Sequence, residues 1–167
     1  MSSLGLSLDE RKHARQLAVN AAKLLFHHAP AVHYTMAAAP RWEGMTQKKL
    51  AWKGEFPTHA DCSSAVTWFM WQVGHHFGLP DFANSENWNG GFTGTLAQHG
   101  KRVTDGKYLL GDVALYGPGP NHTHTALIVS VNGNGEPKVI SHGSEGGPFL
   151  LDLHYRNDLA QVRRLIR

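Results

Sequence analysis

The sequence predicts an α+β fold, with helices in the N-terminal half of the chain and an antiparallel sheet in the C-terminal half. Before residue 80, apolar side chains recur at helical spacing, whereas after residue 110 short β-rich runs alternate with turns. The 18 glycines and 8 prolines agree with many turns and short strands. A chain of 167 residues can bury a core of its own, so we expect one domain over residues 1–167.

The first helix is expected to begin at a capping box, because Ser7 is followed three residues later by Glu10. Apolar residues then recur at helical spacing up to about Phe26. These residues are Leu17, Ala21, Leu24 and Leu25. We therefore expect a helix that packs against the rest of the domain.

The segment from His27 to Thr58 has no regular pattern and contains several prolines, so we expect a long loop or lid with short pieces of structure. It also contains the aromatic residues Tyr34, Trp42 and Trp52. Because loops on a rigid scaffold usually carry binding, we expect selectivity for a ligand to depend on this segment.

A second helix is predicted from Cys62 to Phe77, where Gly78 and Pro80 supply a stop signal. Cys62 lies on its apolar stripe and is the single cysteine of the chain. Peptide N–H groups at a helix start are unpaired and lie at the positive end of the dipole, so we expect a lowered thiol pKa and a nucleophilic role. The alternative is a small buried apolar residue, which is the commoner state of a free cysteine.

After a short helical candidate around Thr95 to His99, the remaining elements are expected to form an antiparallel sheet. The predicted strands are Val113 to Tyr116, Thr125 to Val131, Lys138 to Ser141, Phe149 to His154 and Gln161 to Ile166. The turn Asn132-Gly133-Asn134-Gly135 is a strong hairpin signal between the second and third of these strands.

The hairpin suggests how a cysteine nucleophile could find its base. If the chain folds symmetrically about Gly133, His124 faces His142 on the neighbouring strand, at about 5 Å, within reach of a hydrogen bond between the two rings. A register shifted by one residue would place the two histidines on opposite faces of the sheet. Cys62, His124 and His142 would then supply the nucleophile, the base and the group that orients the base.

His122 is a second candidate for the base, since it lies two residues before His124 and could share its strand face. We favour His124 because it directly precedes an apolar strand, whereas His122 follows the loop Gly117-Pro118-Gly119-Pro120.

From Thr58 to Ser144 the chain resembles the NlpC-type, papain-like peptidases that cut amide bonds in bacterial peptidoglycan. The resemblance rests on the order of four motifs: Asp61-Cys62-Ser63, Gly111-Asp112-Val113-Ala114-Leu115-Tyr116, His124-Thr125-Ala126-Leu127-Ile128-Val129 and Val139-Ile140-Ser141-His142. It implies a papain-like fold in which the nucleophile helix packs on a central antiparallel sheet. The catalytic core would span residues 58–167, after a helix and loop extension over residues 1–57.

The resemblance also implies the site residues. Cys62 matches the nucleophile, His124 the general base and His142 the orienting residue, while Asp112 matches a structural position. Some members bind the free amine of the stem peptide, a role that Asp61, Ser63 and Tyr34 would take here. Helix capping is an equally good explanation of Asp61. The chain departs from the family where Ser64 replaces the usual glycine after Asp-Cys-Ser.

The mechanism implied is acyl transfer through a thioester, and it requires neither a metal nor an organic cofactor. One alternative is a zinc-dependent N-acetylmuramoyl-L-alanine amidase with ligands drawn from His122, His124, His142 and Cys62. Another is a catalytically inactive module that binds the cell wall.

The composition and charge pattern indicate which kinds of partner the chain can bind. The formal charge of +3 and the pI near 9.1 are compatible with polyanions, but the basic residues are scattered and form no nucleic-acid motif. No run reaches transmembrane length, and the first ten residues contain no signal-peptide pattern. We therefore expect a monomer that is made in the cytoplasm and acts on bacterial peptidoglycan after release or injection, as a phage endolysin or an antibacterial amidase effector.

Overall fold

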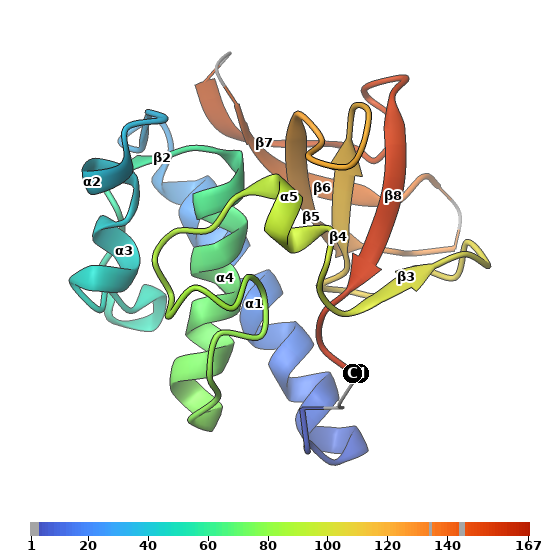
Figure 1. Ribbon diagram of the computed structural model, residues 1–167, viewed down its shortest axis with the longest axis horizontal. Coiled ribbons are helices and arrows are strands. Elements are labelled where there is room, and N and C mark those ends of the chain that lie inside the picture. Colours follow the sequence, from blue (N-terminus) through green and yellow to red (C-terminus); the bar gives the residue numbers. More distant parts are fainter. Residues whose placement is uncertain (1–3, 134, 144–145) are drawn as a thin grey trace.

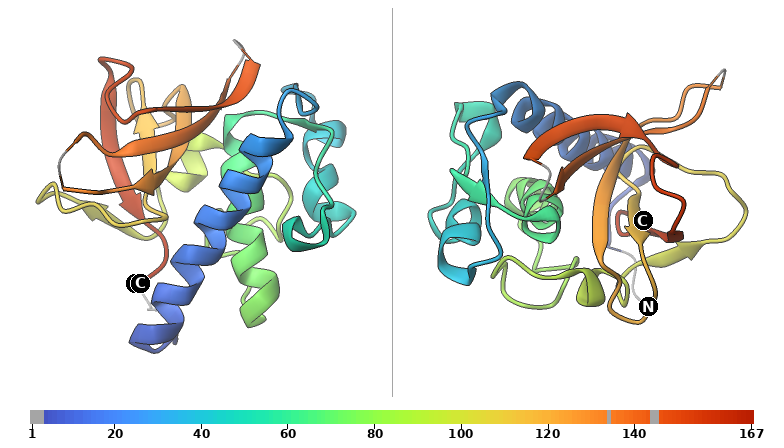
Figure 2. Two further views of the ribbon diagram at one scale, coloured as in Figure 1. Left: turned by 180° about the vertical axis from the view of Figure 1, so that it is seen from behind. Right: turned by 90° about the horizontal axis from the view of Figure 1, so that it is seen from above.

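The structure is a computed structural model that describes residues 4–133, 135–143 and 146–167, and it has the α+β architecture expected from the sequence. Helices α1 (Leu8–His28) and α4 (Cys62–Phe77) lie together on one side of a six-stranded sheet (Figures 1 and 2). The strand order is β3-β8-β4-β5-β6-β7, and every neighbouring pair is antiparallel. The strands are β3 (Lys101–Val103), β4 (Val113–Tyr116), β5 (His124–Ser130), β6 (Lys138–Gly143), β7 (Gly146–Asp152) and β8 (Leu159–Arg164).

Both long helices begin where the sequence signals predict, and α4 also ends there. Ser7 and Glu10 form the capping box of α1, which ends two residues later than expected. Helix α4 has the predicted bounds and ends at Gly78, whose φ of 64° is the left-handed conformation that favours glycine. Residues 62–74 of α4 are all buried, because the helix contacts α1, β2, α3 and the sheet.

The segment before α4 is a series of short elements, as expected for a loop with pieces of structure. They are β1 (His33–Tyr34), α2 (Ala38–Arg41), α3 (Glu43–Thr46), the 3₁₀ helix η1 (Ala51–Lys53) and β2 (His59–Ala60). Strand β1 pairs in parallel with β2, so that Tyr34 lies opposite Ala60. This two-stranded sheet brings the start of the loop next to the start of α4.

The two faces of the six-stranded sheet belong to different apolar clusters. Leu127 and Val129 of β5 join the cluster formed with α1 and α4. Ala126 and Ile128 point the other way and pack with Tyr116 in a second cluster. Alternation along β5 therefore decides which residues can reach α4.

The hairpin register predicted from the sequence is wrong by one residue over most of its length. Leu127 pairs with Ile140 and Ile128 with Val139, and the ladder shifts between Ile128 and Ser130, as at a β-bulge. An extra residue in one strand cannot be read from the turn sequence alone. As a result, His124 and His142 lie on opposite faces of the sheet and do not face each other.

Other differences from the sequence expectations are smaller. The short helix α5 covers Thr93–Leu96, so it begins two residues and ends three residues earlier than predicted, and the sequence does not predict strand β3. The turn residue Asn134 and Ser144, the last residue of the family-like segment, lie outside the described residues. None of the helices in the described ranges has the length and apolar character needed to cross a membrane.

Asp112 has the structural position expected of it. Its side chain is fully buried and accepts two hydrogen bonds from the Arg164 guanidinium, at 3.0 and 2.8 Å, and one from the backbone N–H of Leu109. A nitrogen of Arg15 on α1 lies 3.8 Å from the same carboxylate. Asp112 therefore joins β8, α1 and the turn before β4.

We predict that Asp112→Ala lowers the free energy of unfolding by about 3 kcal/mol, because it leaves the partly buried Arg164 and Arg15 guanidinium groups without their anion. Urea denaturation would measure the change. Asp152→Ala is the control, since its pair with Lys138 has half-exposed side chains on both partners, and its loss should amount to less than about 1 kcal/mol. Equal losses in the two variants would contradict this account.

Candidate active site

Cys62 is the first residue of α4 and its side chain points toward the sheet. The residue is 8% exposed, and the backbone N–H of Thr125 at the start of β5 lies beside the thiol. The N–H groups of Ser63 and Cys62 lie there as well. The thiol is thus in contact with the helix start and with the residue that follows His124.

Burial raises the pKa of Cys62 to about 12, and the neighbouring Asp61 carboxylate adds to the rise. The backbone N–H groups of Thr125, Ser63 and Cys62 favour the thiolate, but their effect is smaller. The lowered pKa expected from the helix start is therefore wrong for the free protein. Removing the thiol from water outweighs the field of the helix dipole.

The Asp61 carboxylate caps α4, which confirms one of its two expected roles. Oδ1 accepts hydrogen bonds from the backbone N–H of Ser64 at 2.7 Å and from the Ser63 hydroxyl at 3.1 Å. In return, the Ser64 hydroxyl accepts from the backbone N–H of Asp61 at 2.9 Å. This reciprocal capping box accounts for Ser64 in place of the usual glycine.

Arg41 is a site residue that the sequence did not reveal. It is the last residue of α2, and its Nη1 donates to Asp61 Oδ2 at 2.9 Å and to the Ser63 hydroxyl at 3.4 Å. The two charged side chains are 16% and 7% exposed. Arg41 lies in the irregular segment, where no motif or periodicity indicates which residue folds back onto the helix start.

His124 is buried at the start of β5, and its Nε2 is hydrogen bonded to the Ser141 hydroxyl at 2.6 Å. The Tyr155 hydroxyl lies 3.3 Å from the same Ser141 oxygen, and the Tyr116 ring lies 5.7 Å from the His124 ring between centroids. The expected hydrogen bond between His124 and His142 is therefore replaced by one between His124 and Ser141. The backbone of His124 still adjoins the thiol, since the next residue is Thr125.

His142 is buried on the opposite face, beside the predicted substrate-binding residues. Its ring lies 5.9 Å from the Tyr34 ring, and the Asp61 carboxylate is close enough to favour the protonated form. Burial is the larger effect and lowers the pKa of His142. Among the described residues, no partner meets full hydrogen-bond geometry with either ring nitrogen, but backbone groups of His33, Gly146 and Ala60 lie close enough to favour the protonated ring. The structure thus brings together Tyr34, Asp61, Ser63 and His142 on the helix side of the sheet.

His122 lies in the loop before β5, as expected, and has the positive φ of 56°. Its Nδ1 donates to the Gly117 carbonyl at 2.9 Å and its Nε2 accepts from the Gln161 amide at 2.9 Å. Within the described ranges, no three His, Cys, Asp or Glu side chains are grouped so as to hold a metal ion. The four residues of the zinc alternative are therefore not assembled into a ligand set.

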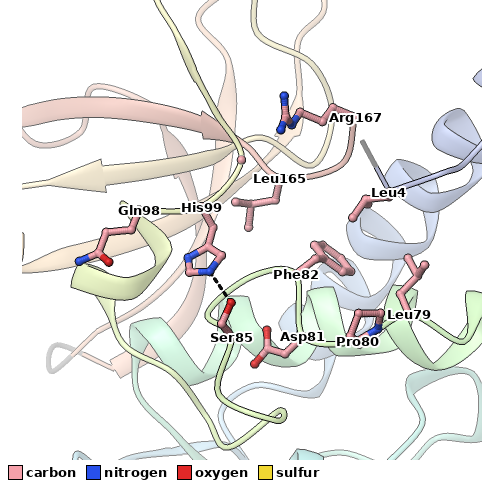
Figure 3. Close-up of a pocket in the computed structure, with 11 residues that line it drawn as sticks. Leu4, Leu79, Pro80, Asp81, Phe82, Ser85, Gln98, His99, Leu165 and Arg167 are labelled. Atoms are coloured by element: carbon pink, nitrogen blue, oxygen red, sulfur yellow. Dashed lines mark hydrogen bonds between the residues drawn. The ribbon is translucent and has the colours of Figure 1, made fainter. Parts of the chain in front are cut away.

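A cavity of about 500 Å³ lies away from the thiol, between the loop after α4 and the end of β8 (Figure 3). Leu4, Phe82 and Leu165 supply apolar walls, and the Ser85 hydroxyl is hydrogen bonded to His99 Nε2 at 2.7 Å. None of the site residues expected from the sequence lines this cavity. Most of the site residues expected from the sequence lie instead around the start of α4.

Comparison with known proteins gives a family match over the part of the chain that contains the start of α4. Residues 51–143 match the family model of the CHAP domain, and no curated protein matches the chain. The peptidoglycan hydrolase RipB from Mycobacterium tuberculosis has a similar structure, with a TM-score of 0.61 and 20% identity over 97% of this chain and 69% of that chain.

Two further solved structures are similar. NlpC1 from Trichomonas vaginalis has a TM-score of 0.53 and 17% identity over 92% of this chain and 44% of that chain. The P60 domain of an antigen from Mycobacterium avium subspecies paratuberculosis has a TM-score of 0.56 and 17% identity over 94% of this chain and 98% of that chain. These likenesses confirm the NlpC-type fold expected from the sequence.

We predict that alkylation of the free protein by iodoacetamide becomes about tenfold faster with each pH unit from 7 to 10, without a plateau, because the reactive thiolate is a minor species throughout. Cys62 is the single cysteine, so mass spectrometry reads its modification directly. The urea-unfolded chain is the control and should level off near the ordinary thiol pKa. A plateau below pH 8 in the folded protein would show that a thiolate is already formed.

Proposed function

Because this chain belongs to the CHAP family of cell-wall cysteine peptidases and amidases, we propose that it hydrolyses an amide bond in the stem peptides of bacterial peptidoglycan. One observation carries the proposal. The single thiol lies at the capped start of a buried helix, beside the backbone N–H of Thr125, which is the residue that follows His124. The peptidoglycan hydrolase RipB has the same fold, which supports this choice of substrate.

Cys62 is the proposed nucleophile and His124 the proposed base. Because Nε2 of His124 is engaged with the Ser141 hydroxyl and the backbone of the next residue, Thr125, adjoins the thiol, Nδ1 is the nitrogen that we propose takes the thiol proton. The hydroxyls of Ser141 and Tyr155 hold the ring in this tautomer and orientation. We therefore assign the orienting role, which the sequence suggested for His142, to Ser141.

The reaction then follows acyl transfer. The Cys62 sulfur forms a bond to the carbonyl carbon while its proton moves to His124, and backbone N–H groups at the start of α4 stabilise the oxyanion. His124 returns the proton to the leaving nitrogen as the C–N bond breaks. Water, deprotonated by His124, hydrolyses the thioester, and the thiol is restored.

The high pKa of Cys62 requires the base to act during the attack. A thiol that is neutral at rest loses its proton as the new bond forms, as a serine hydroxyl does in a serine hydrolase. The N–H groups of Thr125, Ser63 and Cys62 then stabilise the resulting negative charge, which lowers the free energy of the transition state.

The biological setting that we propose is a phage endolysin. The proposed wall substrate fits an enzyme that is made in the host cytoplasm and reaches the wall at lysis. An injected amidase effector is the alternative setting, with the same chemistry.

We predict that Cys62→Ala and His124→Ala each abolish release of soluble fragments from purified peptidoglycan, because they remove the nucleophile and the base. Mass spectrometry of the muropeptides made by the wild-type chain would identify the bond that is cut. Circular dichroism should show both variants folded, since alanine is small enough for each buried site. Undiminished hydrolysis by Cys62→Ala would refute the proposed function.

Ser141→Ala should lower kcat by about tenfold with little change in KM, since a lost hydrogen bond is worth about 1–1.5 kcal/mol. Its pH–rate profile should also move, because Ser141 touches the base itself. His142→Asn is the matched control on the opposite face, and it should leave the pH–rate profile in place. If only the His142 variant moved the profile, the orienting role would belong to His142.

A further inference from the structure

The Arg41–Asp61 ion pair determines what the start of α4 can bind. Both carboxylate oxygens of Asp61 accept hydrogen bonds from the protein itself. Oδ1 accepts from Ser64 and Ser63, and Oδ2 accepts from Arg41. A substrate ammonium group could reach this carboxylate only by displacing the guanidinium. That would leave Arg41, with 16% of its side chain exposed, without its anion.

The guanidinium itself has hydrogen-bonding capacity to spare. Within the described part of the chain its hydrogen bonds are made by Nη1 alone, and Nε is buried without a partner. An arginine fork suits a carboxylate, which can accept two parallel hydrogen bonds from it. Glu86 is the other nearby acid, and Arg41 favours its charged form, although burial and Asp81 together raise the pKa of Glu86.

Packing fixes the position of Arg41. Its Cζ lies 5.8 Å from the centre of the adjacent Trp42 ring. The Trp42 ring is packed so closely on Gly90 that a Cβ atom there would come within 1.8 Å of it. Short element α2 is therefore held against the loop that follows α4, and the guanidinium is directed at the residues flanking the thiol.

We propose that Arg41 forms a carboxylate-binding subsite beside Cys62, which selects acidic stem peptides whose N-terminal amine is acylated. This inference rests on the proposed function. The α-carboxylate of the D-glutamate residue would be the bound anion. The amine of the preceding L-alanine is an amide while the stem is attached to its sugar, so the subsite takes attached stems in preference to released ones.

Four synthetic stem peptides that contain the cleaved bond test the subsite. They combine a free or acetylated L-alanine amine with a D-glutamate α-carboxylate or its α-amide. For the wild-type chain, we expect the highest kcat/KM for the peptide that has both the acetylated amine and the α-carboxylate. Its kcat/KM should exceed that of each peptide with a free amine or an α-amide by about tenfold or more, with the difference mainly in KM.

Arg41→Gln should remove the preference for the carboxylate and raise kcat/KM for the free amine relative to the acetylated peptide, because Asp61 becomes available to the ammonium group. A gain of this kind cannot come from a poorly folded variant. Arg41→Lys should keep the wild-type order with smaller ratios, since it retains the charge but not the fork. Lys53→Gln removes a positive charge from an exposed site in the same segment and should leave the ratios unchanged.

The outcomes separate the two proposals. Cleavage of all four peptides at similar kcat/KM, or a wild-type preference for the free amine, would overturn the subsite while leaving the proposed function intact. Unchanged ratios in Arg41→Gln would overturn it as well. If the wild-type chain cleaves neither these peptides nor purified peptidoglycan, the proposed function fails with it.

Discussion

The Asp61 carboxylate is the group on which the geometry of the site depends. It satisfies the N–H of Ser64 at the start of α4, and it holds both the Ser63 hydroxyl and the Arg41 guanidinium. Because Cys62 follows it directly, the same carboxylate fixes where the thiol emerges from the helix. It also opposes ionisation of that thiol. One side chain thus joins the loop segment, the helix and the nucleophile.

Most of the fold could be predicted from the sequence because its signals are local. The capping box of α1, the glycine stop of α4 and the strand β4 all lie at the predicted residues. Strand pairing is different, since it depends on contacts between distant residues. The register shift between Ile128 and Ser130 changes which residues meet across the hairpin, and the turn sequence contains no sign of it.

The site was predictable to the extent that its residues follow one another in sequence. Asp61, Cys62 and Ser63 form one continuous motif, whereas Arg41 approaches from a segment without periodicity. The sequence does not indicate Ser141 for a related reason, since a symmetric hairpin register favours its neighbour His142. The direction of the Cys62 pKa could not be predicted either, because burial is a tertiary property that outweighs the helix dipole.

The two apolar clusters have a consequence for the proposed proton transfer. Movement of a proton from Cys62 to His124 creates an anion on the helix side of β5 and a cation on the side of Tyr116 and Tyr155. The N–H groups beside the sulfur and the Asp158 carboxylate near His124 favour the two charges, whereas burial and the Asp61 carboxylate oppose the thiolate more strongly. The thiol therefore stays neutral at rest, and the proposed proton transfer to His124 accompanies the attack on the substrate, when the negative charge passes from the sulfur to the carbonyl oxygen.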